Sequence, residues 1–387
     1  MQHIQRSILL LICLTVLFAS FIGAQEKESG DLFKIKVNGK YGFIDNSGKI
    51  VIEPQFQGVD DFSDALATIY VGGKFSTAYI NTTGKIVIQP QFDIGSKFSE
   101  GFAWVGFNKD KTEYKIGNLT LYNSGGTHSF NYDIGFIDKT GKFITEPIFT
   151  FAGDFSEGLA FVRTIDNKFG FIDSTGKFAI QPKFNWAENF SEGLALVFIN
   201  GKYGYINKLG KFVIKPRFTK AESFSEGLAC VKIGGSVREP SFGGSQIITT
   251  TIADTNYAYI DKTGKIIFRI TAGEAYSFSE GLARFELLGD YRQSFVDKSG
   301  KIVIEPKFSG SSDFSEGLSL VILGESDKSF GFMNKTGEIV IKTNYHLAND
   351  FKNGLAEIQE LSPNDDIVNT KYGYINKTGR VIWKPTK

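Results

Sequence analysis

Short apolar runs that alternate between two faces recur along the chain, separated by turn residues. In YGFIDNSGKIVIEPQF, residues 41–56, an alternating strand leads through DNSG into a second apolar strand. The pattern returns as FGFIDSTGKFAIQPKF and YGYINKLGKFVIKPRF. A period of two bounded by Gly, Asn and Asp predicts β-hairpins.

Aligning the sequence on the glycine of this turn gives nine copies of one unit. The glycines are Gly48, Gly84, Gly141, Gly176, Gly210, Gly264, Gly300, Gly337 and Gly379. Fourteen residues after each of the first eight stands a phenylalanine: Phe62, Phe98, Phe155, Phe190, Phe224, Phe278, Phe314 and Phe351. The distance from that Phe to the next glycine varies from 20 to 43 residues. One part of the unit is therefore fixed in length, and the other accepts insertions.

Each hairpin carries specific turn and strand signals. Asp or Asn at the first turn position and Gly at the fourth predict a type I turn closed by a left-handed glycine. The position six residues before the turn glycine is always small, from Gly42 in the first copy to Gly373 in the last. This indicates that an aromatic side chain of a neighbouring strand or unit packs on bare backbone there. Seven copies carry a proline after the second strand, as at Pro54, and we expect it to end that strand.

The third strand of each unit, such as LALVFI, runs into the next hairpin, so the chain divides into three-stranded β-meanders. The units span approximately residues 32–56, 66–92, 102–149, 159–184, 194–218, 228–270, 282–308, 318–345 and 355–385. One unit is too small to bury its apolar face, so neighbours must stack into a single domain over residues 25–387. The sequence predicts an all-β, open, twisted or superhelical solenoid of about nine units. A closed β-propeller-like ring is the alternative, disfavoured because propellers typically have four to eight four-stranded blades.

The N-terminal residues predict export. Arg6 precedes an uncharged apolar run over residues 8–22, and Gly23-Ala24 precede a polar stretch. This is typical of a signal peptide over residues 1–24, cleaved after Ala24, and an uncleaved membrane anchor is the alternative. The expected location is the periplasm, the cell surface or the extracellular space, with no membrane span after cleavage.

Composition and motifs narrow the chemistry. Lys and Arg total 43 against 42 for Asp and Glu, with no basic segment, so nucleic acid is not an expected partner. After cleavage Cys230 is the only cysteine, which excludes an internal disulfide, and we expect it to be a buried core thiol. No metal-binding or nucleophile motif is present. We therefore expect no catalytic residues, metal or cofactor, and no enzymatic activity.

The pattern Lys-aromatic-Gly-Phe-Ile-Asp-x-x-Gly-Lys, followed by an apolar strand, Pro-x-Phe and FSEGLA, resembles the WG-containing repeat family, also described as the KWG repeat. The resemblance covers about residues 31–385, with Tyr or Phe, as at Tyr41 and Phe169, where the family name has Trp. It implies an all-β repeat protein, often exported or associated with the bacterial surface, without an assigned activity.

The connector, FSEG in most copies, contains a recurring acidic residue that admits two interpretations. The acids are Asp64, Glu100, Glu157, Glu192, Glu226, Glu280 and Glu316, with Asn353 in the eighth copy. They could form a ladder that meets a cation or a basic partner. The favoured hypothesis is a structural pair with the lysine after the turn glycine of the same copy, such as Lys177 with Glu192. In the eighth copy both partners change together, to Glu338 and Asn353.

The insertions carry the main functional hypothesis. They span approximately residues 106–132, 234–256 and 360–370, in the third, sixth and ninth units. In a stack that turns by a third of a revolution per unit they would align on one side and present loops to a partner. Tolerated surface drift at a permissive turn is the favoured interpretation. The candidate partner-binding residues are Tyr114, Tyr122, His128, Arg238 and Tyr257.

The sequence thus predicts an exported, non-enzymatic repeat scaffold that binds a protein or a cell-envelope component. The alternative is a module that binds carbohydrate or a small ligand through aromatic residues between repeats. The sequence does not indicate an oligomeric state.

Overall fold

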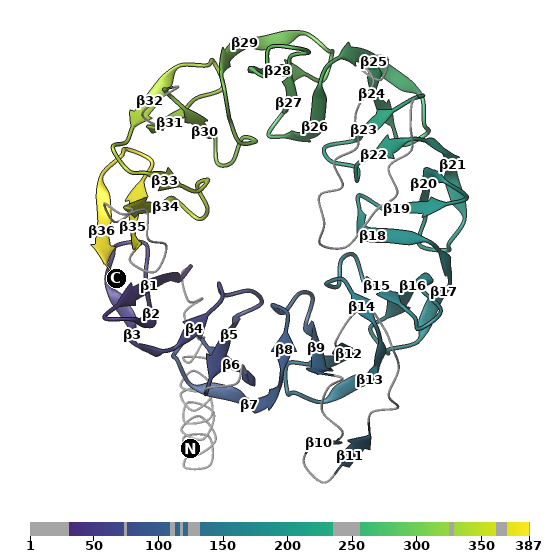
Figure 1. Ribbon diagram of the computed structural model, residues 1–387, viewed down its shortest axis with the longest axis vertical. Coiled ribbons are helices and arrows are strands. Elements are labelled where there is room, and N and C mark those ends of the chain that lie inside the picture. The colour runs from purple at the N-terminus through teal and green to yellow at the C-terminus, as the bar shows by residue number, and fades with distance from the viewer. Residues whose placement is uncertain are drawn as a thin grey trace, which may run out of the picture.

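The chain folds into a ring of nine β-sheet blades around an open centre (Figure 1). The computed structural model describes residues 31–72, 76–108, 113–116, 119–122, 132–234, 256–324, 329–360 and 370–386. All elements in these ranges are strands. The all-β class is as predicted, but the predicted open solenoid is wrong, because the nine units close into a propeller (Figure 1).

The first four blades follow one another in chain order. Blade 1 contains β1 (Phe33–Val37), β2 (Lys40–Ile44) and β3 (Ile50–Phe56). Blade 2 contains β4 (Gly58–Val59), β5 (Leu66–Val71), β6 (Ser76–Asn81) and β7 (Ile86–Phe92). Blade 3 contains β8 (Ile94–Gly95), β9 (Phe102–Asn108), β12 (Tyr132–Asp138) and β13 (Phe143–Phe149). Blade 4 contains β14 (Phe151–Ala152), β15 (Leu159–Arg163), β16 (Phe169–Asp173) and β17 (Phe178–Phe184).

The other five blades complete the ring. Blade 5 contains β18 (Trp186–Ser191), β19 (Leu194–Ile199), β20 (Lys202–Ile206) and β21 (Phe212–Phe218). Blade 6 contains β22 (Lys220–Ala221), β23 (Leu228–Lys232), β24 (Asn256–Asp261) and β25 (Ile266–Thr271). Blade 7 contains β26 (Glu274–Ser279), β27 (Leu282–Glu286), β28 (Gln293–Asp297) and β29 (Ile302–Phe308). Blade 8 contains β30 (Ser319–Ile322), β31 (Phe330–Met333) and β32 (Ile339–Lys342). Blade 9 contains β33 (Leu347–Ala348), β34 (Leu355–Glu360), β35 (Lys371–Asn376) and β36 (Val381–Thr386).

The innermost strand is the element that the sequence analysis missed. In seven blades the segment before the connector forms a fourth strand, which lies nearest the centre and pairs antiparallel with the next strand, as Gly58 and Val59 of β4 pair with Tyr70 and Ile69. In blade 8 this segment is reduced to one bridge, between Ser311 and Val321. A blade of four strands is the standard propeller unit, and this extra strand removes the main argument against closure.

The predicted turn is confirmed, whereas the role predicted for proline is wrong. Gly48 has a φ of 88° and donates its amide to the Asp45 carbonyl at 3.0 Å, which gives the expected three-residue loop. Pro54 lies inside β3, the outer strand of blade 1, where its lack of an N–H leaves no ladder bond unmade. The register between β2 and β3 shifts at Gly42, opposite Pro54, so the outer strand is bulged there.

That bulge also explains the small residue six positions before the turn. A Cβ on Gly42 would lie 2.4 Å from the carbonyl oxygen of Ile52 and 2.6 Å from the nitrogen of Pro54. The close neighbour is therefore the backbone of the hairpin's own outer strand, and the predicted neighbouring aromatic is not what approaches this position.

The core consists of aromatic contacts that cross from one blade to the next. In blades 2 to 9 the connector phenylalanine packs on an aromatic residue of the preceding blade, in the first strand of its hairpin. Phe98 lies 4.9 Å from Tyr79 and Phe190 lies 5.0 Å from Phe171, as ring centroids, and both contacts are edge-to-face. These four rings are at most 1% exposed. Each blade thus completes the core of its neighbour, as expected for a repeat protein.

Side-chain packing between blades 1 and 9 closes the ring. Phe33 of β1 packs edge-to-face on Tyr374 of β35 at 5.5 Å between centroids. The Tyr374 hydroxyl donates to the Lys34 carbonyl oxygen at 2.8 Å. In the described residues, every sheet takes its strands from one stretch of the chain, so no strand is shared across this junction.

The ring changes the interpretation of the insertions. They lie between the second and third strands of blades 3, 6 and 9, and nine blades make one turn (Figure 1). Their flanking strands are therefore spaced a third of a turn apart around the ring, so the insertions do not lie one above another as in the predicted stack. Most of their residues lie outside the described ranges, and a shared binding face stays a prediction. The first insertion contains the expected hairpin, β10 (Glu113–Ile116) and β11 (Leu119–Tyr122).

Candidate functional site

The connector acids join neighbouring blades in one direction around the ring. The Glu192 carboxylate of blade 5 accepts the Gly227 amide of blade 6 at 2.9 Å, and Ser191 beside it donates its hydroxyl to the Phe224 carbonyl at 2.7 Å. We call this pair of bonds the inter-blade latch. It joins blades 2 to 9 at all seven interfaces, through Asp64, Glu100, Glu157, Glu192, Glu226, Glu280 and Glu316 with their neighbouring serines.

The lysine partner of these acids differs from the prediction. Glu192 pairs with Lys262 at 3.1 Å, and Lys262 is the second residue of the hairpin turn in the next blade. The predicted partner, Lys177, belongs to the preceding blade. The same pairing joins Lys139, Lys208, Lys298, Lys335 and Lys377 to Asp64, Glu157, Glu226, Glu280 and Glu316. The structural hypothesis for the acids therefore holds with different cations.

Three of the latch carboxylates, those of Glu192, Glu280 and Glu316, have lowered pKa values. Partial burial alone would raise the pKa of Glu192, but Lys262 and the backbone amides of the next turn outweigh it and hold that pKa below its usual range. The pKa of Glu280 and that of Glu316 are lowered in the same way. Since the folded-state pKa is depressed, the stabilisation is present above the unfolded-state pKa and is lost as the pH falls through the folded-state value.

A double-mutant cycle separates the two pairings. We expect Glu192→Ala to lower the free energy of unfolding by about 1–2 kcal/mol, because the Gly227 amide loses a charged acceptor. Glu192→Ala and Lys262→Ala should be coupled by less than about 1 kcal/mol, since the pair is partly exposed to solvent. Urea denaturation of the single and double mutants measures both quantities. The control cycle with Lys177→Ala should show no coupling, and a coupling there would restore the pairing within one copy.

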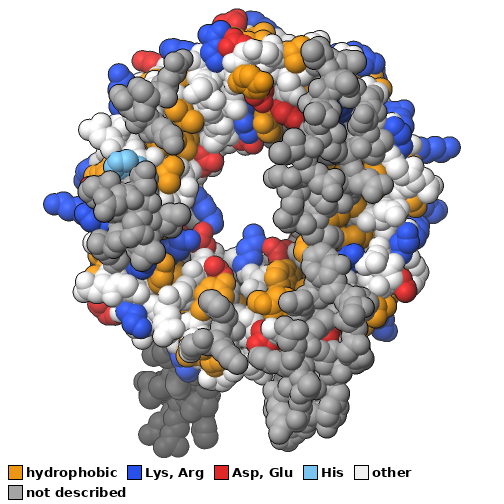
Figure 2. Space-filling model, in the orientation of Figure 1, with side chains coloured by type: hydrophobic (Ala, Val, Ile, Leu, Met, Phe, Trp, Pro, Cys, Tyr) orange, Lys and Arg blue, Asp and Glu red, His pale blue; other side chains and the backbone are white. Residues whose placement is uncertain are grey.

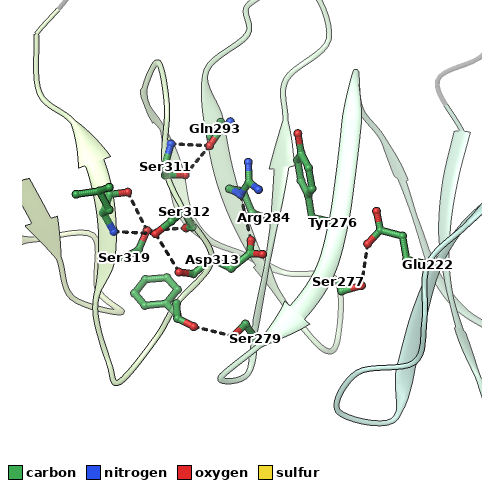
Figure 3. A network of polar contacts seen from close by, with 12 residues as sticks. Glu222, Tyr276, Ser277, Ser279, Arg284, Gln293, Ser311, Ser312, Asp313 and Ser319 are labelled. Atoms are coloured by element: carbon green, nitrogen blue, oxygen red, sulfur yellow. Dashed lines mark hydrogen bonds and ion pairs between the residues drawn. The ribbon is translucent and has the colours of Figure 1, made fainter. Parts of the chain in front are cut away.

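A second row of polar contacts lies on the innermost strands (Figure 3). The Ser223 hydroxyl donates to the Glu188 carboxylate at 2.8 Å. Ser277 donates to Glu222 at 2.7 Å (Figure 3). Both bonds cross from one blade to the next. Burial raises the pKa of Glu188 and of Glu222 above the usual range, against the effect of the two serines. These two acids therefore contrast with Glu192, Glu280 and Glu316 of the latch, whose pKa values are lowered.

Blade 7 adds a cation to this row. The Arg284 guanidinium lies 3.7 Å from the ring centroid of Tyr276 and pairs through Nε with Asp313 of blade 8 at 3.1 Å (Figure 3). A guanidinium held between an aromatic face and a carboxylate is a rigid arrangement. In the space-filling view acidic and basic side chains both border the central opening, which stays open when side chains are drawn (Figure 2).

The sequence departs from the latch pattern around blade 1. Blade 9 carries Lys352 and Asn353 where the other connectors carry Ser and an acid. Blade 2 has Ala65 in place of the connector glycine, and its turn carries Thr82 where most turns carry lysine, as the turn of blade 4 carries Ser174. The residues that would make latches on either side of blade 1 are therefore replaced together.

A cavity of about 1000 Å³ lies where the latch pattern is interrupted. Residues of blades 1, 2 and 9 line it, and we call it the first-blade cavity. Leu32 and Phe62 contribute partly exposed apolar surface, whereas the phenylalanines equivalent to Phe62 are at most 2% exposed in the other connectors.

Charged groups surround this apolar surface. Asp61 pairs with Lys34 of blade 1 at 3.4 Å and with Lys352 of blade 9 at 3.5 Å. Burial opposes the charge on Lys34, but Asp61 and Glu357 outweigh burial and raise its pKa. The cavity thus combines apolar surface with fixed charges, as ligand-binding cavities do.

The predicted partner-binding residues do not form one site. Tyr114 lies in β10 and Tyr122 in β11, on the hairpin of the first insertion. His128 and Arg238 lie outside the described residues. Tyr257 is 1% exposed, and its hydroxyl donates to the Glu274 carboxylate at 2.7 Å, so it is a core residue and its proposed place on a binding surface is wrong. A partner-binding role for Tyr114 and Tyr122 stays a prediction.

The described residues add three findings on chemistry. Cys230 is 2% exposed, as predicted, and burial raises the pKa of its thiol. The described residues contain no group of three or more His, Cys, Asp or Glu side chains placed to hold a metal ion. Across the same ranges there is no helix of the length and hydrophobicity that crossing a membrane requires.

Comparisons with known proteins identify the repeat. Eight segments match the family described as WG containing repeat: residues 41–75, 78–109, 134–169, 169–203, 203–236, 257–291, 294–325 and 330–360. No curated protein matches the chain. Similar solved structures include the dihydro-heme d1 dehydrogenase NirN in complex with DHE, which is 10% identical over 94% of this chain and 76% of that one, with a TM-score of 0.46. BamB from Moraxella catarrhalis is 12% identical over 85% and 93% of the two chains, with a TM-score of 0.40. The WD40 beta propeller domain of Doa1 is 10% identical over 92% and 98%, with a TM-score of 0.34.

Proposed function

Because the chain belongs to the WG containing repeat family and its repeats close into one propeller, we propose that it is an exported, non-enzymatic scaffold that binds a protein of the cell envelope. The observation that carries this proposal is the first-blade cavity. It offers partly exposed apolar surface at Phe62 and paired charges at Asp61 in a ring that is otherwise latched. A rigid scaffold with one adapted site suits recognition of a partner.

The aromatic residues between blades favour a protein over a carbohydrate ligand. Carbohydrate binding between repeats requires aromatic faces that are open to solvent. Tyr79, Tyr205 and Tyr259, which lie at three such interfaces, are 0% exposed. Each donates its hydroxyl to a backbone carbonyl of the next blade. These rings stabilise the fold, and we propose the protein ligand for that reason.

Affinity capture from an envelope extract tests the binding role. The wild-type protein should retain a specific partner, and Asp61→Lys should abolish retention because it reverses the charge that pairs with Lys34 and Lys352 in the cavity. Glu305→Lys, on the exposed outer strand of blade 7, is the matched control and should retain the partner. Equal capture by both variants, or selective binding to a glycan array, would contradict the proposal.

Export is tested separately from binding. We expect the native protein to be recovered outside the cytoplasm and its N-terminal sequence to begin at Gln25. Recovery in the cytoplasm with Met1 intact would contradict export and leave the binding proposal standing.

A further inference from the structure

The first-blade cavity borders one edge of β1. In the other blades the equivalent edge pairs antiparallel with the innermost segment, as β5 pairs with β4 through Ile69 and Tyr70. Counting from the leucine after the connector, Ile35 and Lys36 are the equivalent residues of β1. β1 pairs with β2 along its other edge. Leu32, Phe33 and Lys34, at the start of β1, line the cavity.

The hydroxyl of Tyr374 bonds the β1 carbonyl to which an innermost strand would otherwise donate. In blade 2 the carbonyl of Thr68, equivalent to that of Lys34, accepts the amide of Asp60 from the innermost segment at 3.0 Å. At Lys34 the same carbonyl accepts the Tyr374 hydroxyl at 2.8 Å. The tyrosine equivalent to Tyr374 in other blades donates to the innermost segment of the next blade, as Tyr205 does to the Glu222 carbonyl. Tyr374 therefore bonds β1 in place of an inner-strand amide.

The chain's own residues before β1 do not match the innermost segments of the other blades. In register with AENFSEG, residues 187–193, the sequence reads QEKESGD, residues 25–31. It places Glu28 where every other connector has Phe, and Gly30 where seven have an acid. The connector phenylalanines pack on an aromatic ring of the preceding blade, and burying an unpaired carboxylate against such a ring is costly. A segment of another chain with phenylalanine at this position would therefore fit the cavity better than residues 25–31.

We propose that the first-blade cavity binds an extended peptide of another protein, which adds an inner strand antiparallel to β1. This inference rests on the proposed scaffold function and names the class of its partner. The internal segments define the peptide: in seven of the eight a small residue is followed by phenylalanine three positions later, as in Ala187 and Phe190 or Ala275 and Phe278, and the eighth has Val59 before Phe62. Ala187 and Ala275 are fully buried, so the small residue is required by space.

The charges of the cavity specify the peptide further. Asp31, Asp61, Asp64, Asp350 and Glu357 line it, against Lys34 and Lys352. This excess of carboxylates favours a peptide with a basic residue beside the phenylalanine. The innermost segment of blade 3 has this composition, with Lys97 before Phe98 in IGSKFS, residues 94–99. Strand addition of this kind combines main-chain bonds for affinity with side-chain pockets for specificity.

Fluorescence anisotropy with the purified protein tests the proposal. A labelled IGSKFS peptide should bind saturably, and IGSKAS should bind at least about tenfold more weakly because the buried aromatic ring is lost. IGSEFS should also bind more weakly, since its glutamate meets the acidic lining. Equal binding of IGSKFS and IGSKAS, or no binding of any peptide, would overturn the proposal.

Variants of the protein locate the binding site. Glu28→Phe, Gly30→Glu and Asp31→Gly together restore the FSEG connector in cis, and this triple variant should lose peptide binding and melt at a higher temperature. Asp61→Asn should weaken IGSKFS binding, whereas Asp290→Asn, at the exposed Arg292 pair in blade 7, should leave it unchanged. Peptide binding that persists in the triple variant would overturn the proposal. Failure of the wild-type protein to bind IGSKFS, together with capture of an envelope protein that Asp61→Lys abolishes, would reject this peptide class and keep the scaffold function.

Discussion

Replacing Phe190 by alanine is expected to lower the free energy of unfolding by about 3–5 kcal/mol. The ring is 1% exposed and lies edge-to-face against Phe171 of the preceding blade, at 5.0 Å between centroids. Alanine would leave a cavity at the interface of blades 4 and 5, where neither blade can close it alone. Urea denaturation followed by tryptophan fluorescence and by circular dichroism measures the loss and tests whether the ring unfolds in one step.

Phe62→Ala is the matched control for this substitution. Phe62 occupies the equivalent position and packs on Phe43 at 4.7 Å, but it is partly exposed to the first-blade cavity. We expect its loss to be at most about half of that for Phe190→Ala, because less apolar surface returns to water. Equal losses would show that the ring of Phe62 is as enclosed as that of Phe190, and would remove the apolar surface from the proposed binding site.

Gly204→Val is expected to destabilise the protein by more than about 3 kcal/mol, or to prevent folding. A Cβ at Gly204 would lie 2.8 Å from both the carbonyl oxygen of Ile214 and the nitrogen of Pro216, which belong to the bulged outer strand. Backbone atoms in a sheet cannot turn away as the end of a side chain can. The melting temperature, together with the yield of soluble protein, measures the effect.

Gly204→Ala separates crowding by a large side chain from crowding by any Cβ. Ala78 and Ser294 occupy the same position opposite a proline-containing outer strand in blades 2 and 7. A single methyl group is therefore accommodated in this sheet, and we expect Gly204→Ala to cost about 1 kcal/mol. A loss for alanine as large as that for valine would show that blade 5 is more tightly bulged than blades 2 and 7.

The hairpin was predictable because its signals are local. The Asp45 and Gly48 turn has a sequence requirement that few other structures share, and it forms as expected. The fourth strand was missed because two residues, such as Gly58 and Val59, show no periodicity. The structure shows why the connector implies a further strand. Glu192 and Gly193 both have positive φ angles, of 53° and 86°, so the pair is a two-residue hairpin loop, which requires a strand on each side.

The pairing of the acids could not be read from spacing along the chain. Glu192 and Lys177 lie closer in sequence than Glu192 and Lys262, yet the ring places Glu192 against the blade that follows it. Closure of the repeats into a ring could not be predicted from the sequence either, because it depends on the small rotation between neighbouring sheets. The cavity was visible only in part: Lys352 and Asn353 stand out as exceptions in an alignment of copies, but their position beside blade 1 follows from closure.

All seven latches run in the same direction, from one blade to the next along the chain. The order in which the blades are synthesised therefore matters for how the latches form. The acid and the serine belong to the earlier blade, and the glycine amide and phenylalanine carbonyl belong to the later one. When the ribosome delivers blade 6, the groups that bond it are already present on blade 5. Each new repeat is therefore received by the one before it, which suits folding from the N-terminus while the chain is still being made.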